Sequence, residues 1–348
     1  MADKGYSYLG ASNRKNLESF EEDVLGRVCD LAGIPFAKDF SIFWGFGSFS
    51  VYRNRNYIVS ILAASGNDFD FHNTAFVLDS LKSLGVTPNL IAHGLLDNVF
   101  PYIVLQTPMA MPCKQFDDRE FFFKSAKINW SENKNEKMNQ ALELNKKFIT
   151  GKEITLGRTL AAIHDTAKFP EDIKNKSTFL DLPESIYNLY PKLSELIQLC
   201  KLEYKKLEKS EFYIVSSLFF NPDMTLTNGE LYMPVEWSSV SRLDARTEIG
   251  SVFLHFELSD FENYVASYIR ECGLEFIKTN QIQQNDCLKM GAIFNFFQSL
   301  HYYSFSNEEK SFSKEVYKTK LRKAVQNVFS FAIQNKALEN KLKVLMKF

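Results

Sequence analysis

One segment, Ile214 to Trp237, limits the possible folds of this chain more than any other. It reads IVSSLFFNPDMTLTNGELYMPVEW and begins with a short apolar run that is typical of a buried strand. A loop follows, and then two short apolar runs flank Asn228-Gly229, which is a strong signal for a two-residue turn between antiparallel strands. The segment therefore predicts a strand, a loop and a hairpin closed at Asn228-Gly229.

The residues before 108 alternate between helical and strand patterns. Apolar residues recur at helical spacing in two places, whereas β-branched and aromatic residues cluster between turn signals in the others. The predicted elements are, in order, a helix over 17–34, strands over about 39–45, 48–53 and 56–63, a helix over about 69–84, and strands near 89–94 and 101–107.

The second half of the chain is predicted to be mostly helical. Residues 112–150 carry many charges and amides, which fits either a solvated insertion with some helix or a variable surface linker. Helical spacing resumes at Glu153 and returns over 183–209 and from 259 to the end. The last stretch, 314–348, alternates basic and apolar residues, so it is either a packed terminal helix with a charged outer face or a helix for a membrane surface or partner.

Composition excludes some classes of partner. The formal net charge of the 348 residues is −1, whereas binding to nucleic acids or anionic membranes needs a basic excess, so neither partner is expected. The five cysteines are dispersed without a CxxC pair, which favours reduced thiols. The N-terminus lacks the apolar core of a signal peptide. We expect a cytoplasmic location, although secretion by a route without a signal peptide fits the sequence too.

Four stretches resemble motifs of the aminoglycoside phosphotransferase and choline kinase family. Residues 85–109 resemble "gvpvPevl…g…pyllmerlpG", and residues 156–164, LGRTLAAIH, resemble "lGraLAaLH". Residues 214–237 resemble the catalytic loop and metal-binding strand, and residues 239–256 resemble "a..GDPa.DLA..l". These motifs occur in the family's order between about residues 40 and 270.

This resemblance implies an α+β, two-lobed protein kinase-like fold, with a small antiparallel-sheet N-lobe and a mostly helical C-lobe. It also implies ATP and Mg²⁺ as cofactors. The resulting domains are an N-terminal helical segment (1–38), the N-lobe (39–108), a polar insertion or linker (109–150) and the C-lobe (151–348) with the catalytic-loop-like hairpin at 214–237.

A glycine-containing loop is the clearest candidate for nucleotide binding. It runs Gly45-Phe46-Gly47-Ser48-Phe49-Ser50, and its two glycines let backbone N–H groups approach a phosphate. The hydroxyls of Ser48 and Ser50 can add donors. The candidate nucleotide-binding residues are Gly45, Gly47, Ser48, Phe49 and Ser50, although an ordinary tight turn explains the same glycines.

Three positions that the family uses for chemistry carry unsuitable side chains here. Ser60 stands at the position of the phosphate-pairing lysine, and Thr74 at that of the glutamate that holds this lysine. Leu218 stands at the position of the aspartate that orients the attacking hydroxyl, and leucine cannot accept a proton.

Two carboxylates remain at metal-binding positions. Asp223 falls on the family's metal-binding asparagine and Glu236 on its metal-binding aspartate, so both are candidate Mg²⁺ ligands. Asp223 is also the only carboxylate in the loop that can replace the missing base. Asp244 and Glu248 match acidic positions that tie down helices, and His164 is expected to be a hydrogen-bonded core histidine.

Two hypotheses about function follow. The first is a degenerate kinase-like protein, a pseudokinase, that acts by binding a small molecule or a protein without transferring phosphate. The alternative is a divergent ATP- and Mg²⁺-dependent small-molecule phosphotransferase that uses Asp223 and Glu236. Whether the chain is an enzyme depends on which of these is correct.

Overall fold

The computed structural model describes most of the chain outside the N-terminal tail and the polar insertion. The described residues are 19–36, 40–46, 49–54, 56–62, 71–98, 100–107, 111–112, 151–168, 178–182, 184–189, 191–217, 220–222, 225–227, 232–235, 237, 240–274, 282–306 and 313–345. Of the predicted insertion or linker over 109–150, only residues 111–112 are among them.

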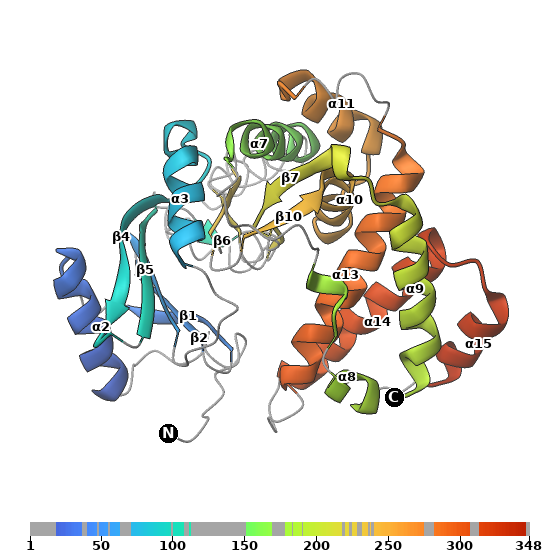
Figure 1. The fold of residues 1–348 in the computed structure, drawn as a ribbon, viewed down its shortest axis with the longest axis horizontal. Helices are drawn as coiled ribbons and strands as arrows, with labels where there is room; N and C mark the ends of the chain where they lie inside the picture. The colour runs from blue at the N-terminus through green and yellow to red at the C-terminus, as the bar shows by residue number, and fades with distance from the viewer. Residues whose placement is uncertain are drawn as a thin grey trace, which may run out of the picture.

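The N-terminal part is an antiparallel five-stranded sheet with the strand order β1-β2-β3-β5-β4 (Figure 1). Its elements are the helices α2 (Ser19–Ala32) and α3 (Phe71–Leu81), the 3-10 turn η1 (Lys82–Leu84), and the strands β1 (Ser41–Phe46), β2 (Phe49–Arg53), β3 (Tyr57–Leu62), β4 (Asn89–Leu96) and β5 (Phe100–Gln106). Each strand and helix predicted in this part is present, with ends shifted by a few residues.

Alternation along β3 separates the two faces of this sheet. Val59 and Ile61 pack in a cluster with α2, whereas Ile58, on the opposite face, belongs to the same core as α3. The period of two is what a strand imposes when both of its faces are covered. The two helices therefore cover opposite faces of the sheet.

The second half contains small strands and many helices. The strands are β6 (Met111–Pro112), β7 (Tyr213–Ser216), β8 (Thr225–Thr227), β9 (Tyr232–Pro234) and β10 (Ser241–Asp244). The helices are α7 (Lys152–Thr166), α8 (Glu184–Leu189), α9 (Ser194–Leu207), α10 (Ala245–His255), α11 (Phe261–Glu271), α13 (Gln284–Ser306), α14 (Ser313–Phe331) and α15 (Lys336–Leu345), with the 3-10 turns η2 (Thr178–Leu180), η3 (Pro191–Leu193) and η4 (Ser210–Phe212).

The long helix α13 forms the centre of the helical part, where it packs against α10 and α14 (Figure 1). Its approach to α10 depends on Gly250 and Gly291, because a Cβ atom on either would overlap backbone atoms of the other helix. A Cβ on Gly157 of α7 would likewise overlap Ser267 of α11. Glycine at these crossings lets the backbones of paired helices come close together.

The C-terminal stretch departs from the prediction in one respect. The pattern over 314–348 predicted a single terminal helix, but the structure divides it into α14 and α15. Asn335 explains the second start, since its side-chain oxygen accepts a hydrogen bond of 3.0 Å from the backbone N–H of Leu338. Both helices bury apolar residues in the core, among them Val328 and Leu342.

The predicted hairpin turn is also wrong in its register. A two-residue turn at Asn228-Gly229 would place Thr227 opposite Glu230, but β8 and β9 pair Thr227 with Tyr232. Tyr232 and Met233 are buried in the core, and because the two pairings differ by two residues, both place the same side chains on the buried face. Alternation of apolar residues therefore does not distinguish the two registers, and Asn228 and Gly229 themselves lie outside the described residues.

Candidate functional site

Ser60 lies in the middle of β3, opposite Val51 of β2 and Ile103 of β5. Its position two residues after Ile58 places it on the sheet face that α3 covers. Only 4% of Ser60 is exposed. The structure thus places an uncharged and buried side chain where the resemblance calls for a lysine.

Thr74, on α3, is fully buried. Its Oγ1 atom has no hydrogen-bond partner within the described part of the chain. A threonine with a methyl and a hydroxyl group cannot hold a cation, so neither Ser60 nor Thr74 supplies the ion pair that positions a phosphate.

The candidate nucleotide loop joins β1 to β2. Gly45 pairs with Ser50 and Phe46 with Phe49, so the backbones of these residues form the end of a hairpin. Gly47 and Ser48 connect the strands and lie outside the described residues. Their predicted role toward a phosphate therefore stays a prediction.

The catalytic-loop-like segment starts from β7, which pairs with β10 and places Ser216 opposite Ser241. Beyond β7 the side chains of Ser217, Phe220 and Asn221 are buried, with exposures of 2%, 4% and 6%. The three positions that decide the chemistry of this loop, Leu218, Asp223 and Glu236, lie outside the described residues.

The described parts of this loop make internal contacts. The hydroxyl of Thr225 donates to the carbonyl of Asn221 at 2.7 Å, and the indole N–H of Trp237 donates to the carbonyl of Pro234 at 2.9 Å. The rings of Phe220 and Phe256 meet edge to face, with their centroids 5.8 Å apart. Loop and hairpin are therefore held by packing against Phe256, which directly follows α10, as well as by hydrogen bonds to their own backbone.

His164 is a buried, hydrogen-bonded histidine, as predicted. Its Nε2 atom lies 3.0 Å from Oε2 of Glu248, and its Nδ1 atom lies 2.8 Å from the hydroxyl of Tyr268. Burial raises the pKa of Tyr268 well above its usual range, so this phenol keeps its proton. The three side chains tie α7, α10 and α11 together.

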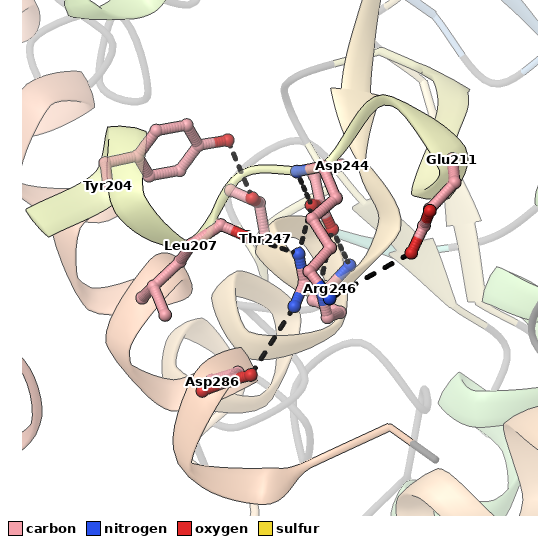
Figure 2. A network of polar contacts seen from close by, with 8 residues as sticks. Tyr204, Leu207, Glu211, Asp244, Arg246, Thr247 and Asp286 are labelled. Carbon is pink, nitrogen blue, oxygen red and sulfur yellow. Dashed lines mark hydrogen bonds and ion pairs between the residues drawn. The ribbon is translucent and has the colours of Figure 1, made fainter. Parts of the chain in front are cut away.

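Asp244 caps α10, which confirms its predicted structural role. Its carboxylate accepts a hydrogen bond of 3.0 Å from the backbone N–H of Arg246 and one of 2.7 Å from that residue's guanidinium. Figure 2 shows the guanidinium also reaching Asp286 and the carbonyl of Leu207, at 3.4 and 2.7 Å. The sequence did not predict this role of Arg246, although its place two residues after the capping aspartate was a usable signal.

The four described cysteines are all buried. Cys29, Cys200, Cys272 and Cys287 form no disulfide within the described residues. Burial raises the pKa of Cys29 to about 11, which keeps this thiol protonated. In the ranges that the structure describes, no three His, Cys, Asp or Glu side chains are grouped to hold a metal ion. None of the described helices is long and apolar enough to span a membrane.

Neither a protein-family model nor a curated protein sequence matches this chain. Solved structures do match it. A choline/ethanolamine kinase family protein from Mesorhizobium loti superposes with a TM-score of 0.54 at 12% identity, over 94% of this chain and 100% of that protein. A choline kinase from Cryptosporidium parvum Iowa II gives a TM-score of 0.52 at 12% identity, over 88% of this chain and 94% of that one.

Antibiotic kinases match to a similar extent. A thermostable mutant of aminoglycoside phosphotransferase APH(4)-Ia, in a ternary complex with AMP-PNP and hygromycin B, gives a TM-score of 0.52 at 12% identity, over 89% of this chain and 99% of that one. Such low identity establishes similarity of fold and nothing finer. The chain has the α+β, two-lobed protein kinase-like fold that these small-molecule kinases share.

Proposed function

We propose that this chain is a pseudokinase that acts by binding a small molecule or a protein and does not transfer phosphate. One observation carries this proposal. Ser60 and Thr74, at the positions of the family's lysine and glutamate, are uncharged, and their exposed fractions are only 4% and 0%.

The physical reason is electrostatic. A triphosphate brings several negative charges together, and transfer of its last phosphoryl group needs positive charge nearby, from a lysine and from Mg²⁺. A serine hydroxyl offers one dipole in place of a full charge. The described residues of this sheet face therefore do not fit ATP, and no catalytic step through ATP is assigned to them.

The C-lobe side supports the same proposal. Ser217, Phe220 and Asn221 are nearly inaccessible, and Phe220 packs on Phe256. A loop that orients a substrate hydroxyl must present polar atoms to that substrate. Here the described polar residues of the loop are turned into the protein.

The alternative function is a divergent ATP- and Mg²⁺-dependent phosphotransferase in which Asp223 and Glu236 hold the metal and Asp223 serves as the base. What favours it is the fold, since a solved neighbour with the same architecture contains AMP-PNP together with hygromycin B. This alternative function requires another cation in place of the missing lysine.

ATP turnover by the purified chain separates the two functions. We expect the release of ADP from ATP and Mg²⁺ to be no faster with the wild type than with the Asp223→Asn/Glu236→Gln double variant, which keeps the shape of both side chains while removing their charge. Turnover in the wild type that needs Mg²⁺ and disappears in the double variant would establish the phosphotransferase. A thermal unfolding profile of both proteins confirms that the variant is folded.

A further inference from the structure

We propose that the two lobes share one continuous hydrophobic core, and that this core occludes the sheet face on which a kinase-like protein seats its nucleotide. Building on the proposed binding role, this places the ligand or partner of the chain outside the space between the lobes. Neither ATP nor ADP binds there.

The first observation is the burial of the sheet face itself. Ile58 and Ser60 point to the same side of β3, and Ile103 and Leu105 lie opposite them on β5. Their exposed fractions are 1%, 4%, 2% and 1%. A face that receives a ligand stays accessible until the ligand arrives, whereas this face is covered in the protein alone.

The second observation is continuity with the C-lobe. The same buried cluster contains Ile58 and Leu105 of the sheet, Leu78 of α3, and Leu156 and Leu160 of α7. Figure 1 shows α3 lying between the sheet and α7. Separating the lobes to admit a base would expose these apolar side chains to water, which is unfavourable.

A polar contact joins the lobes at the same place. The backbone N–H of Lys168, just after α7, donates to the hydroxyl of Ser80 on α3 at 3.2 Å. The hydroxyl of Ser80 in turn donates to the carbonyl of Val77 at 2.6 Å. This connection fixes α3 relative to α7 in addition to the apolar contacts.

The third observation is the state of the buried hydroxyls. The Oγ1 atoms of Thr74 and Thr107 have no hydrogen-bond partner among the described residues, and the two residues are 0% and 4% exposed. Thr107 follows β5 directly, two residues after Leu105, so it continues the same side of the strand. The surrounding protein therefore shields both residues from solvent at this face.

Nucleotide binding tests the occlusion directly. We expect no saturable heat and no rise in the thermal unfolding midpoint when the full chain is titrated with ADP or AMP-PNP, with or without Mg²⁺. A saturable signal that is weakened in Ser60→Asp, whose new charge would repel phosphate, would overturn the occlusion. If ADP binds but ATP is not turned over, the proposed occlusion is wrong while the proposed lack of phosphate transfer still holds. The two proposals can therefore fail independently.

Restoring the missing lysine gives an independent test. In an open site, the Ser60→Lys side chain would reach solvent, and the unfolding midpoint would hardly change. In an occluded core the same change buries a charge, so we expect the midpoint to fall by about 5 °C or more. Asn56→Lys, at an exposed position just before the same strand, should leave the midpoint unchanged.

A second, uncharged variant at the same position tests the occlusion if Ser60→Lys does not fold. Ser60→Met adds a similar length without charge, and it should also lower the midpoint because a packed core has no room for it. Midpoints of Ser60→Met and Ser60→Lys equal to that of the wild type would overturn the occlusion.

Discussion

The Nε2 atom of His164 lies 3.0 Å from the carboxylate of Glu248, and this contact joins α7 to α10 in the protein interior. With Nε2–H donating to Glu248, Nδ1 is left to accept the hydroxyl proton of Tyr268, so the bonds of all three side chains are compatible. Because α7 packs beside β7 and β9, and α10 packs beside β7 and β10, this network helps to hold the strands that support the catalytic-loop-like segment.

Removal of the Glu248 side chain tests that network. In Glu248→Ala, His164 loses its acceptor while it stays buried, so we expect the free energy of unfolding to fall by about 1–3 kcal/mol. Glu248→Gln keeps an acceptor oxygen and should lose less. Urea denaturation measures both changes, and an alanine variant as stable as the wild type would show that the contact contributes nothing.

The crossing of α10 and α13 supplies a second prediction. A Cβ atom on Gly250 would overlap the carbonyl of Cys287, and the backbone of Gly291 lies on the same side. In Gly250→Ala the two helices must therefore move apart, and we expect a loss of about 3 kcal/mol or more in the free energy of unfolding.

Gly26 is a matched control for this change. It lies within α2, where an added Cβ atom meets nothing within 4 Å. Gly26→Ala should therefore be neutral or stabilise by about 0.5–1 kcal/mol, because alanine restricts the unfolded chain and favours the helix. Equal destabilisation of both variants would contradict the close helix crossing.

The local elements could be predicted from the sequence because their signals are local. Val59 and Ile61 alternate with Ile58 and Ser60, which predicts a strand covered on both faces. The LGRTLAAIH stretch predicted both the helix α7 and the buried state of His164, since an apolar helix that carries a histidine must find partners for it.

The features that the sequence could not predict depend on contacts between distant segments. The packing of Tyr232 depends on Phe256, which directly follows the later helix α10. The arginine network needs Asp286, forty positions beyond Arg246. No pattern within a short window of sequence contains this information. The helical period likewise continues past Asn335, so it did not predict the division into α14 and α15.

His301 provides a prediction about pH. Burial lowers the pKa of this residue below the ordinary value of 6.5, while its Nε2–H bond of 3.3 Å to the carbonyl of Phe179 opposes the shift. When the pH falls through about 6.5, the unfolded chain takes up a proton before the folded protein does, so stability declines. Above that pH both states are unprotonated at this site, and its contribution is constant.

The Gln variant isolates this contribution. His301→Gln keeps an N–H donor for Phe179 but does not titrate. We expect the free energy of unfolding of the wild type to fall more steeply between pH 7.5 and 5 than that of His301→Gln, measured by urea denaturation at each pH. Parallel pH profiles for the two proteins would show that His301 takes up its proton equally in both states.

Thr74 yields the prediction that bears most directly on the sheet face. Its hydroxyl is fully buried without a partner among the described residues, and burial of a hydroxyl without a hydrogen bond is unfavourable. Thr74→Val replaces that hydroxyl with a methyl group of similar size. We expect the free energy of unfolding to rise by about 1 kcal/mol.

Thr225 is the matched control, because it is equally buried but donates to the carbonyl of Asn221 at 2.7 Å. Thr225→Val should lower the free energy of unfolding by about 1 kcal/mol, so the same substitution has opposite signs at the two sites. A Thr74→Val variant that is less stable than the wild type would mean that the hydroxyl has a hydrogen-bond partner in solution. The face beside β3 would then be hydrated, and a polar ligand would again have a place there.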